Sequence, residues 1–504
     1  MILAEDLCSG CGLCSERCPV EAIQMEDKLP RFNDLCVLCG LCVSLCPVNA
    51  LSIPQETQKD GLICDHCPVG CQIREGFMGA CQRYRNIKGV LKTTQPLIFP
   101  PPPNIEEEKR NLVISVPLVT GIGAGTTYPD YVPSPITAQE KRHDIDVVTV
   151  VTEAPLTYSS ILLKIDTEQP VGKEMAPVRT KGHIVGHVTT EQYGSKMISL
   201  GGINLMKTKE NVILTRLMVA VANKEPFQLT VEGGTHLELQ VGKPPVINGE
   251  ESKPMKVACG AAIMGMFGPQ LKDLADEMII LDSDITGLFS ESHVGRLMGF
   301  KETGIKPPGR FATPGRYFGT VGNGWGGTPI LNPLQALASI DKEKIWPGMK
   351  VLILEVTGRE AVLLEADEEK VFHVIELPKE AMEMRDLIAS NREPSLTSGM
   401  YIGGAGGSAR SGVTRNPIKL TQAVHHGSVR MSVGGAPTFI FPGGGINFMV
   451  DVRKISWRAF TWVPTPAVVA PIEYTMQRET FIQMGGHKQA LRLLSDIKAS
   501  EASQ

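Results

Sequence analysis

Cysteine is nearly absent from most of this 504-residue chain, since Cys259 is the single one beyond residue 81. Aromatic residues make up only 5 %, which gives little support for a surface that stacks nucleic-acid bases. The formal net charge is −4, so the composition favours neither nucleic acid nor an anionic membrane as a partner. The most apolar run, 460–471, is broken by Pro464 and Pro466 and is too short to span a membrane. These absences predict a soluble protein.

The other twelve of the thirteen cysteines lie in the first 81 residues, in three groups of four. The first two groups share the spacing C-x2-C-x2-C-x3-C followed by proline, which is typical of bacterial two-cluster ferredoxins. In such runs the fourth cysteine ligates the other cluster. The spacing therefore predicts one [4Fe–4S] cluster on Cys8, Cys11, Cys14 and Cys46, and a second on Cys36, Cys39, Cys42 and Cys18.

A disulfide scaffold is a weaker interpretation of the same cysteines. The ligand cysteines begin at residue 8, which leaves no room for a secretory segment before them. We expect a cytoplasmic protein, and a cytoplasmic setting keeps thiols reduced.

The third group has less regular spacing and a less certain ligand. Cys64, Cys67, Cys71 and Cys81 are separated by two, three and nine residues. Four thiolates could hold a [2Fe–2S] cluster, a zinc ion or a third cubane, and proximity to two cubanes favours [2Fe–2S] over zinc. His66 lies between two of the ligands, but with four cysteines available we expect it to be a bystander.

The chain divides into a cysteine-rich N-terminal part and a large body. We expect a ferredoxin-like domain over 1–56, a four-cysteine module over 57–94 and a proline-rich linker over 95–111. The linker is either an extended spacer or a strap packed on the body. Residues 112–504 form the body, in one or two subdomains. The 51 glycines and 36 prolines predict many short strands, so the fold class is α+β with a β-rich α/β body.

Several elements of the body can be predicted from residue patterns. Strands are expected at 112–120, 145–153, 229–239 and 351–356. A β-α-β unit is expected from strand 255–261, a helix opened by Pro269 and strand 278–282. Helices are expected at 379–390, after strand 371–377, and at 487–499 near the C-terminus.

The body should contain an acceptor for electrons from the clusters. A one-electron relay feeding a two-electron reaction needs a centre that stores both electrons, and a flavin, FMN or FAD, is the usual choice. Glycine-rich segments at 309–329, 398–417 and 432–447 could approach such a ligand; their candidate contacts are Gly404, Gly407, Gly443 and Gly444. None has the strand–GxGxxG–helix context of a dinucleotide fold, and each could equally be a turn in a β-rich core.

A few further side chains are candidates for the chemistry. Cys259 could tether a flavin covalently, although a lone cysteine is more often an inert buried residue. His425 and His426 could supply the proton that accompanies a hydride, or lie unused at the surface. Arg316 and Tyr317 could polarise a substrate carbonyl, or serve only as structural loop residues.

The order of these parts resembles the 6-hydroxynicotinate reductase family. The resemblance is specific in Cys8–Cys46 and in the third group, CDHCPVGC…GAC, and looser in the body. It implies two [4Fe–4S] clusters, one [2Fe–2S] cluster and a covalently bound flavin in a cytoplasmic homo-oligomer. It also implies that an external ferredoxin drives reduction of 6-hydroxynicotinate, a small N-heterocyclic acid, to 6-oxo-1,4,5,6-tetrahydronicotinate.

The resemblance carries over no catalytic residue, so these stay predictions from chemistry. The substrate carboxylate would call for an arginine, a role that Arg310, Arg316 or Arg410 could fill. The sequence thus predicts an oxidoreductase that acts on a CH–CH group with an iron–sulfur protein as donor. The main alternative is a non-catalytic electron-transfer subunit whose body docks a partner enzyme.

Overall fold

The computed structural model describes residues 1–54, 61–101, 114–121, 134, 136–191, 195–256, 260–282, 287–305, 324–338, 340–404 and 408–503. Five of the predicted site residues lie outside these ranges: Cys259, Arg310, Arg316, Tyr317 and Gly407.

The N-terminal part consists of two similar halves. Each has a short helix that follows a glycine in the left-handed region, Gly12 (φ 74°) before α1 and Gly40 (φ 73°) before α2. Glycine has no Cβ to clash in this conformation, so the chain can turn tightly between successive cysteines. The elements are β1 (Ile2–Leu3), α1 (Leu13–Glu16), β2 (Ile23–Glu26), β3 (Leu29–Phe32), α2 (Leu41–Leu45) and β4 (Leu51–Ser52). Strand β1 pairs with β4 and β2 with β3, both antiparallel.

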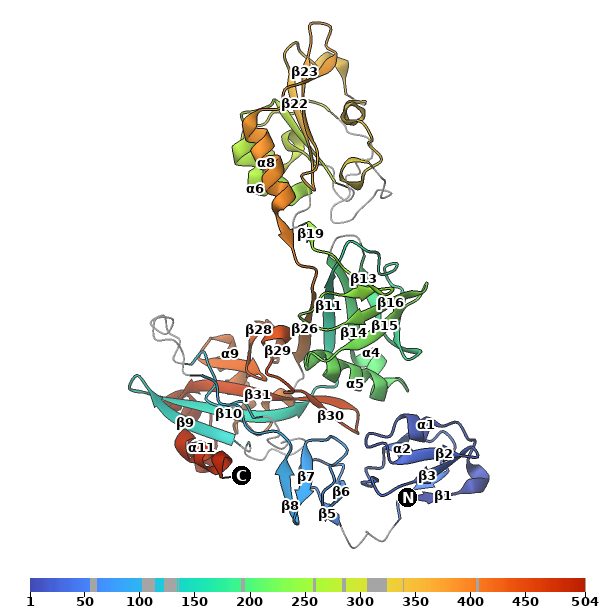
Figure 1. Cartoon of the computed structure of the whole chain (residues 1–504). Helices are drawn as coiled ribbons and strands as arrows, with labels where there is room; N and C mark the ends of the chain where they lie inside the picture. The colour runs from blue at the N-terminus through green and yellow to red at the C-terminus, as the bar shows by residue number, and fades with distance from the viewer. Residues whose placement is uncertain are drawn as a thin grey trace.

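The third cysteine group sits on two small hairpins beside the first part (Figure 1). Strand β5 (Gly61–Ile63) pairs with β6 (Gln72–Arg74), and β7 (Tyr84–Ile87) pairs with β8 (Val90–Thr93). The described part of the linker then lies against the body: Ile98 and Thr120 exchange backbone hydrogen bonds of 3.0 and 2.7 Å. This part of the linker is therefore packed as a strap.

The body is built around a closed barrel of mostly antiparallel strands. Its longest strands, β10 (Ile145–Pro155) and β31 (Ala467–Gln477), pair along most of their length. Both are rich in β-branched residues and are buried on both faces, which favours the strand conformation. The other barrel strands are β9 (Ile136–Arg142), β11 (Ser160–Asp166), β12 (Pro177–Thr180), β13 (His183–Thr190), β14 (Ser195–Gly201), β15 (Phe227–Val231), β16 (Thr235–Leu239), β17 (Val246–Ile247), β18 (Glu250–Glu251), β26 (Thr397–Gly404), β27 (Val429–Val433), β28 (Ala436–Phe441), β29 (Asn447–Asp451), β30 (Thr461–Val463) and β32 (Leu491–Leu493).

One helix of the barrel faces the cysteine-rich part. Helix α5 (Asn211–Ala222) buries Val212, Leu214, Met218 and Val221, and lies next to α1 and α2 in Figure 1. The remaining helices of the barrel are α4 (Ile203–Met206), α9 (Pro417–His425), α10 (Arg478–Gln483) and α11 (Leu494–Ala502).

A second subdomain is inserted into the barrel between β18 and β26. The chain leaves and returns through a two-stranded ribbon, β19 (Met255–Lys256) and β25 (Arg392–Glu393) (Figure 1). Its sheet has the order β21-β20-β22-β23-β24, in which β20 and β22 run parallel. The elements are α6 (Gly260–Leu271), β20 (Glu277–Leu281), β21 (Gly287–Leu288), α7 (His293–Leu297), β22 (Lys350–Glu355), β23 (Ala361–Ala366), β24 (Phe372–Ile375) and α8 (Lys379–Ser390).

The α+β fold class is confirmed, as are the strand at 145–153 and the helix at 379–390. The helix expected to open at Pro269 begins instead at Gly260. It contains Pro269 in its last turn, because the apolar residues before the proline already form a buried helical face. The strand expected at 229–239 is a hairpin, β15 and β16.

Two other expected elements were wrong. Residues 114–119 form turns and irregular chain instead of a strand, and Thr120 makes a single bridge to Ile98. Pro117 cannot donate to a ladder, and the Leu118 N–H donates to Thr149 Oγ1 at 3.0 Å. The C-terminal helix begins at Leu494 instead of His487, because 491–493 form β32, which pairs with β9.

Candidate redox site

The first cysteine-lined cavity combines both halves of the N-terminal part. Cys8, Cys11 and Cys14 line it together with Cys46, which belongs to the second run. The Ala50 N–H donates to Cys46 Sγ at 3.2 Å, and such bonds stabilise a thiolate ligand. This arrangement fits the crossed ligand set expected for a cubane.

The second set is the mirror of the first. Buried Cys18 packs with Cys36 and Cys42 of the other run, and the Ala22 N–H donates to Cys18 Sγ at 3.2 Å. Burial and, to a smaller extent, the neighbouring Cys39, Cys36 and Cys18 together raise the pKa of the Cys42 thiol to about 12. Cys18 therefore lies with the second run, as crossed ligation requires.

The third set lines a cavity at the border of the body. Cys64, Cys67, Cys71 and Cys81 surround it. Val463 and Pro464, from the end of β30 and the turn after it, complete the lining. The His66 ring stacks on Tyr84 with the ring centroids 4.0 Å apart. The body thus closes this cavity with apolar side chains.

The three sets follow one another in space. Cys14 of the first set is near enough to Cys42 of the second to raise the pKa of its thiol. Cys39 of the second set has the same effect on Cys71 of the third and packs against the same apolar cluster. The order first, second, third is therefore set by contacts between neighbouring ligands.

The surroundings of these thiols are better suited to metal ligands than to free thiolates. Burial raises the pKa of the Cys39 and Cys64 thiols to about 11. A buried thiolate needs a neighbouring cation, and metal binding supplies it by displacing the proton. All twelve cysteines are free of disulfides in the structure.

The spacing of the ligands also bears on the kind of metal centre. Within the described residues, no three Cys, His, Asp or Glu side chains gather closely enough to hold a single metal ion. A cluster distributes its thiolates over several irons, whereas zinc draws four ligands around one ion. The kind of centre on the third set stays a prediction.

A buried ion pair joins the third set to the barrel. Arg83, two residues after Cys81, is bonded to Glu153 on β10, and both side chains are almost fully buried. Burial acts to raise the pKa of Glu153 and the guanidinium acts to lower it. We take Glu153 as ionised, since a buried guanidinium without a counter-charge would be costly. The pair fixes Cys81 against the body.

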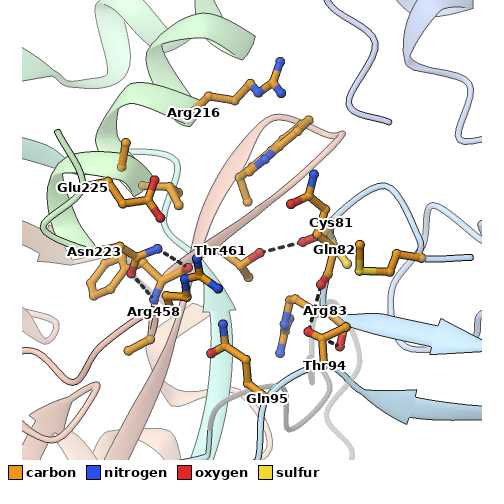
Figure 2. Close-up of a pocket in the computed structure, with 16 residues that line it drawn as sticks. Cys81, Gln82, Arg83, Thr94, Gln95, Arg216, Asn223, Glu225, Arg458 and Thr461 are labelled. Carbon is orange, nitrogen blue, oxygen red and sulfur yellow. Dashed lines mark hydrogen bonds between the residues drawn. The ribbon is translucent and has the colours of Figure 1, made fainter. Parts of the chain in front are cut away.

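A further cavity, which is polar and has a volume of about 390 Å³, adjoins the third cysteine-lined cavity at Cys81 (Figure 2). It is bordered by the chain around Cys81, by one face of α5 and by the segment that leads into β30. Its polar lining includes Arg216, Asn223, Glu225, Arg458 and Thr461. Cys81 and Arg83 line both this cavity and the third cysteine-lined cavity.

None of the predicted catalytic and flavin residues within the described ranges lines this polar cavity. His425 ends α9 and His426 follows it, both exposed. Gly404 lies opposite Asn447 in the β26–β29 pair, close to the turn that holds Gly443 and Gly444. The structure therefore brings these three glycines together, at the same end of one strand pair.

Close packing explains why one of these three positions, Gly404, must be a glycine. A Cβ on Gly404 would lie 2.4 Å from Asn447 Oδ1, whereas around Gly444 there is open space. Arg410 donates to Thr421 Oγ1 at 2.6 Å and so ties α9 to its neighbour. The flavin-binding and catalytic roles of these residues stay predictions.

The residues of the polar cavity were missed by sequence reasoning, although two signals exist. Arg216 is the one charged residue in the apolar helix NVILTRLMVAVA. Trp457 and Trp462 enclose Arg458 in the stretch WRAFTW, in a chain with only four tryptophans. Both signals mark the face that the body turns toward Cys81.

Comparisons with known proteins agree with this site. The 4Fe-4S binding domain family matches residues 1–24 and 30–52, so the N-terminal part binds [4Fe–4S] clusters. A curated protein of Eubacterium barkeri, 6-hydroxynicotinate reductase, is 41 % identical over 497 residues, covering 98 % of this chain and 99 % of its own length. No solved structure matches the chain.

Two plain conclusions follow from these findings. Among the described residues, no helix has both the length and the apolar character needed to cross a membrane. The N-terminal match and the extended identity make the protein an iron–sulfur oxidoreductase. The chain belongs to the 6-hydroxynicotinate reductase family.

Proposed function

We propose that this protein is a ferredoxin-dependent reductase of an N-heterocyclic carboxylic acid. Its proposed reaction converts 6-hydroxynicotinate to 6-oxo-1,4,5,6-tetrahydronicotinate, which takes up two electrons and two protons. The relative from Eubacterium barkeri carries the name of this activity, and its identity extends over nearly the whole chain. An external ferredoxin is the proposed donor, in a cytoplasmic homo-oligomer.

One observation carries the proposal: Cys81 lines both the third cysteine-lined cavity and the polar cavity. Electrons that reach the third set are thus one side chain away from a space large enough for a small ligand. A non-catalytic electron-transfer subunit would have no need of such a space.

The proposed cofactors follow the three cysteine sets. We propose [4Fe–4S] clusters on the first two sets and [2Fe–2S] on the third. A covalently bound flavin would store two electrons and deliver them as a hydride. Its attachment residue is proposed to be Cys259.

The chain's own residues have separate tasks in this proposal. The two runs of cysteines hold the clusters within one compact unit, and Arg83 with Glu153 fixes the third set against the barrel. Val463 and Pro464 exclude water from that set. A dry setting strengthens the electrostatic effect of each nearby charge on the centre.

The proposal is tested with anaerobically purified protein. Reduced ferredoxin and 6-hydroxynicotinate should give the tetrahydro product, with two ferredoxins oxidised for each product formed. Acid precipitation should leave flavin colour in the protein pellet, and a Cys259→Ala variant should release it. Iron and inorganic sulfide should exceed the content of two cubanes.

Other results would contradict the proposal in distinct ways. Protein with intact clusters but no flavin and no product would be an electron-transfer subunit. One zinc per chain, with sulfide equal to that of two cubanes, would contradict [2Fe–2S] on the third set.

A further inference from the structure

We propose that the polar cavity beside Cys81 binds the electron acceptor through its carboxylate, with Arg216 as the anion-binding side chain and Arg458, at another part of the lining, adding positive charge. This inference rests on the proposed function and names the place and the recognition of its substrate. The ligand class is a small planar heterocycle that carries one carboxylate.

The position of the cavity is the first argument. Its wall includes Cys81, the last ligand of the third set, so a ring bound here would lie next to the last of the three cysteine sets. Hydride transfer to that ring requires the proposed flavin to enter the same cavity. The volume of about 390 Å³ falls in the range of pockets for small ligands.

The charge of the lining is the second argument. Arg83 is already paired with Glu153, but within the described part of the chain neither Arg216 nor Arg458 has a carboxylate partner. Glu225 is the one acidic residue of the lining, and it is exposed. Two guanidinium groups against one exposed carboxylate leave the cavity with surplus positive charge, which suits an anion.

Both arginines are held in position by aromatic rings. Arg216 Cζ lies 5.6 Å from the centroid of the Trp462 ring, and Arg458 Cζ lies 4.3 Å from that of Trp457. A guanidinium that stacks on a ring keeps its N–H groups free for a carboxylate.

The wall that carries these side chains is rigid. Thr461 Oγ1 donates to the Cys81 carbonyl at 3.0 Å (Figure 2). Asn223, after the last turn of α5, donates to the Phe460 carbonyl at 2.9 Å and accepts the Phe460 N–H at 3.0 Å. These bonds tie α5, the segment before β30 and the third cysteine set together, so the cavity exists before a ligand arrives.

The test compares two electron acceptors, 6-hydroxynicotinate (the acid) and its uncharged carboxamide. Arg216→Gln should raise KM for the acid by about 10- to 100-fold, the usual effect of losing a hydrogen bond to a charged group. It should leave KM for the carboxamide nearly unchanged. Arg458→Gln should act in the same direction but less, since Arg458 is exposed. Arg216→Lys should restore part of the loss, and Arg430→Gln, an exposed arginine outside the cavity, should have no effect.

A spectroscopic measurement separates this inference from the proposed function. Adding the acid to reduced wild-type protein should shift the EPR signal of the third centre, and Arg216→Gln should require a higher concentration for the same shift. If wild type reduces the acid but Arg216→Gln changes neither KM nor the titration, the cavity assignment is wrong while the function stands. If Arg216→Gln instead loses flavin, the cavity holds a cofactor phosphate and the inference is likewise overturned. If the wild-type protein binds the acid but does not reduce it, the proposed function is refuted while the binding site stands.

Discussion

The first and third cysteine-lined cavities lie at opposite ends of the same relay and have opposite surroundings. In the first, Cys11 is exposed. In the third, Cys64 and Cys71 are buried, and the body covers the set with Val463, Pro464 and the Arg83–Glu153 pair. The first set is thus accessible from the surface, whereas the third adjoins the polar cavity.

In the proposed function, this difference separates the two redox partners of one chain. A donor protein needs a flat, accessible site, whereas reduction of a ring needs an enclosed one from which water is excluded. Placing three centres between the two ends lets each be built for its own partner. Substitutions at the two ends should therefore have unequal effects.

The largest effect should come from removing one ligand at each end. Cys71→Ala should lower acceptor reduction by at least about 100-fold, more than the effect typical of residues around a ligand, whatever donor is used. Cys11→Ala should lower activity with ferredoxin but retain much of it with a small viologen donor, which can reach the later centres. Steady-state rates with both donors would check this; equal losses for both variants would contradict the order of the relay.

A smaller effect should follow from breaking one ion pair at each end. Glu153→Gln leaves Arg83 buried without its counter-charge, which should cost about 3–5 kcal/mol and lower the unfolding midpoint of the protein. The pair between Arg31 and Glu5 near the first set is exposed, so Glu5→Gln should cost about 0–1 kcal/mol. Thermal unfolding followed by circular dichroism measures both. Similar midpoints for the two variants would mean that Arg83 finds another partner.

The last effect is spread over several pH units and concerns a second buried carboxyl, Glu473 of β31. Burial raises its pKa from 4.5 to about 8, while a hydrogen bond from Ser432 acts against this. The folded protein therefore binds the proton more tightly than the unfolded chain does. Its contribution to stability is complete below pH 4.5 and is lost as the pH rises to about 8, by at most about 1.4 kcal/mol per pH unit.

Glu473→Gln should remove that part of the pH dependence, because the amide does not titrate. Urea unfolding at pH 5 to 8.5 would measure the slope. If the free energy of unfolding of the wild type rose with pH over this interval, and Glu473→Gln removed that rise, the raised pKa of Glu473 would be contradicted.

The two ends also differ in how far the sequence could predict them. The crossed ligand sets follow from local spacing, because the glycines at 12 and 40 and the cysteines around them lie within a few residues of one another. The polar cavity could not be predicted in this way. Its lining comes from segments near residues 81, 95, 220 and 460, which meet only after the barrel has closed.

In the body, predictions from the sequence were most accurate for elements whose own residues show a clear helix or strand pattern. Helix α8 and strand β10 are such cases. Residues 114–120 misled because their apolar residues resemble a strand, but they pack across β10 and take no place beside it in the sheet. Here tertiary packing, and not local strand propensity, determined the conformation of the chain.

The ribbon that joins the inserted subdomain to the barrel bears on how such proteins can diversify. Met255 pairs with Glu393 and Lys256 with Arg392, so the points of departure and return are one strand spacing apart, about 5 Å. A tight loop could bridge that gap without altering the barrel. An exchange of everything between these points would also replace Cys259, the proposed flavin attachment residue, while the route from Cys11 to Cys81 stayed the same.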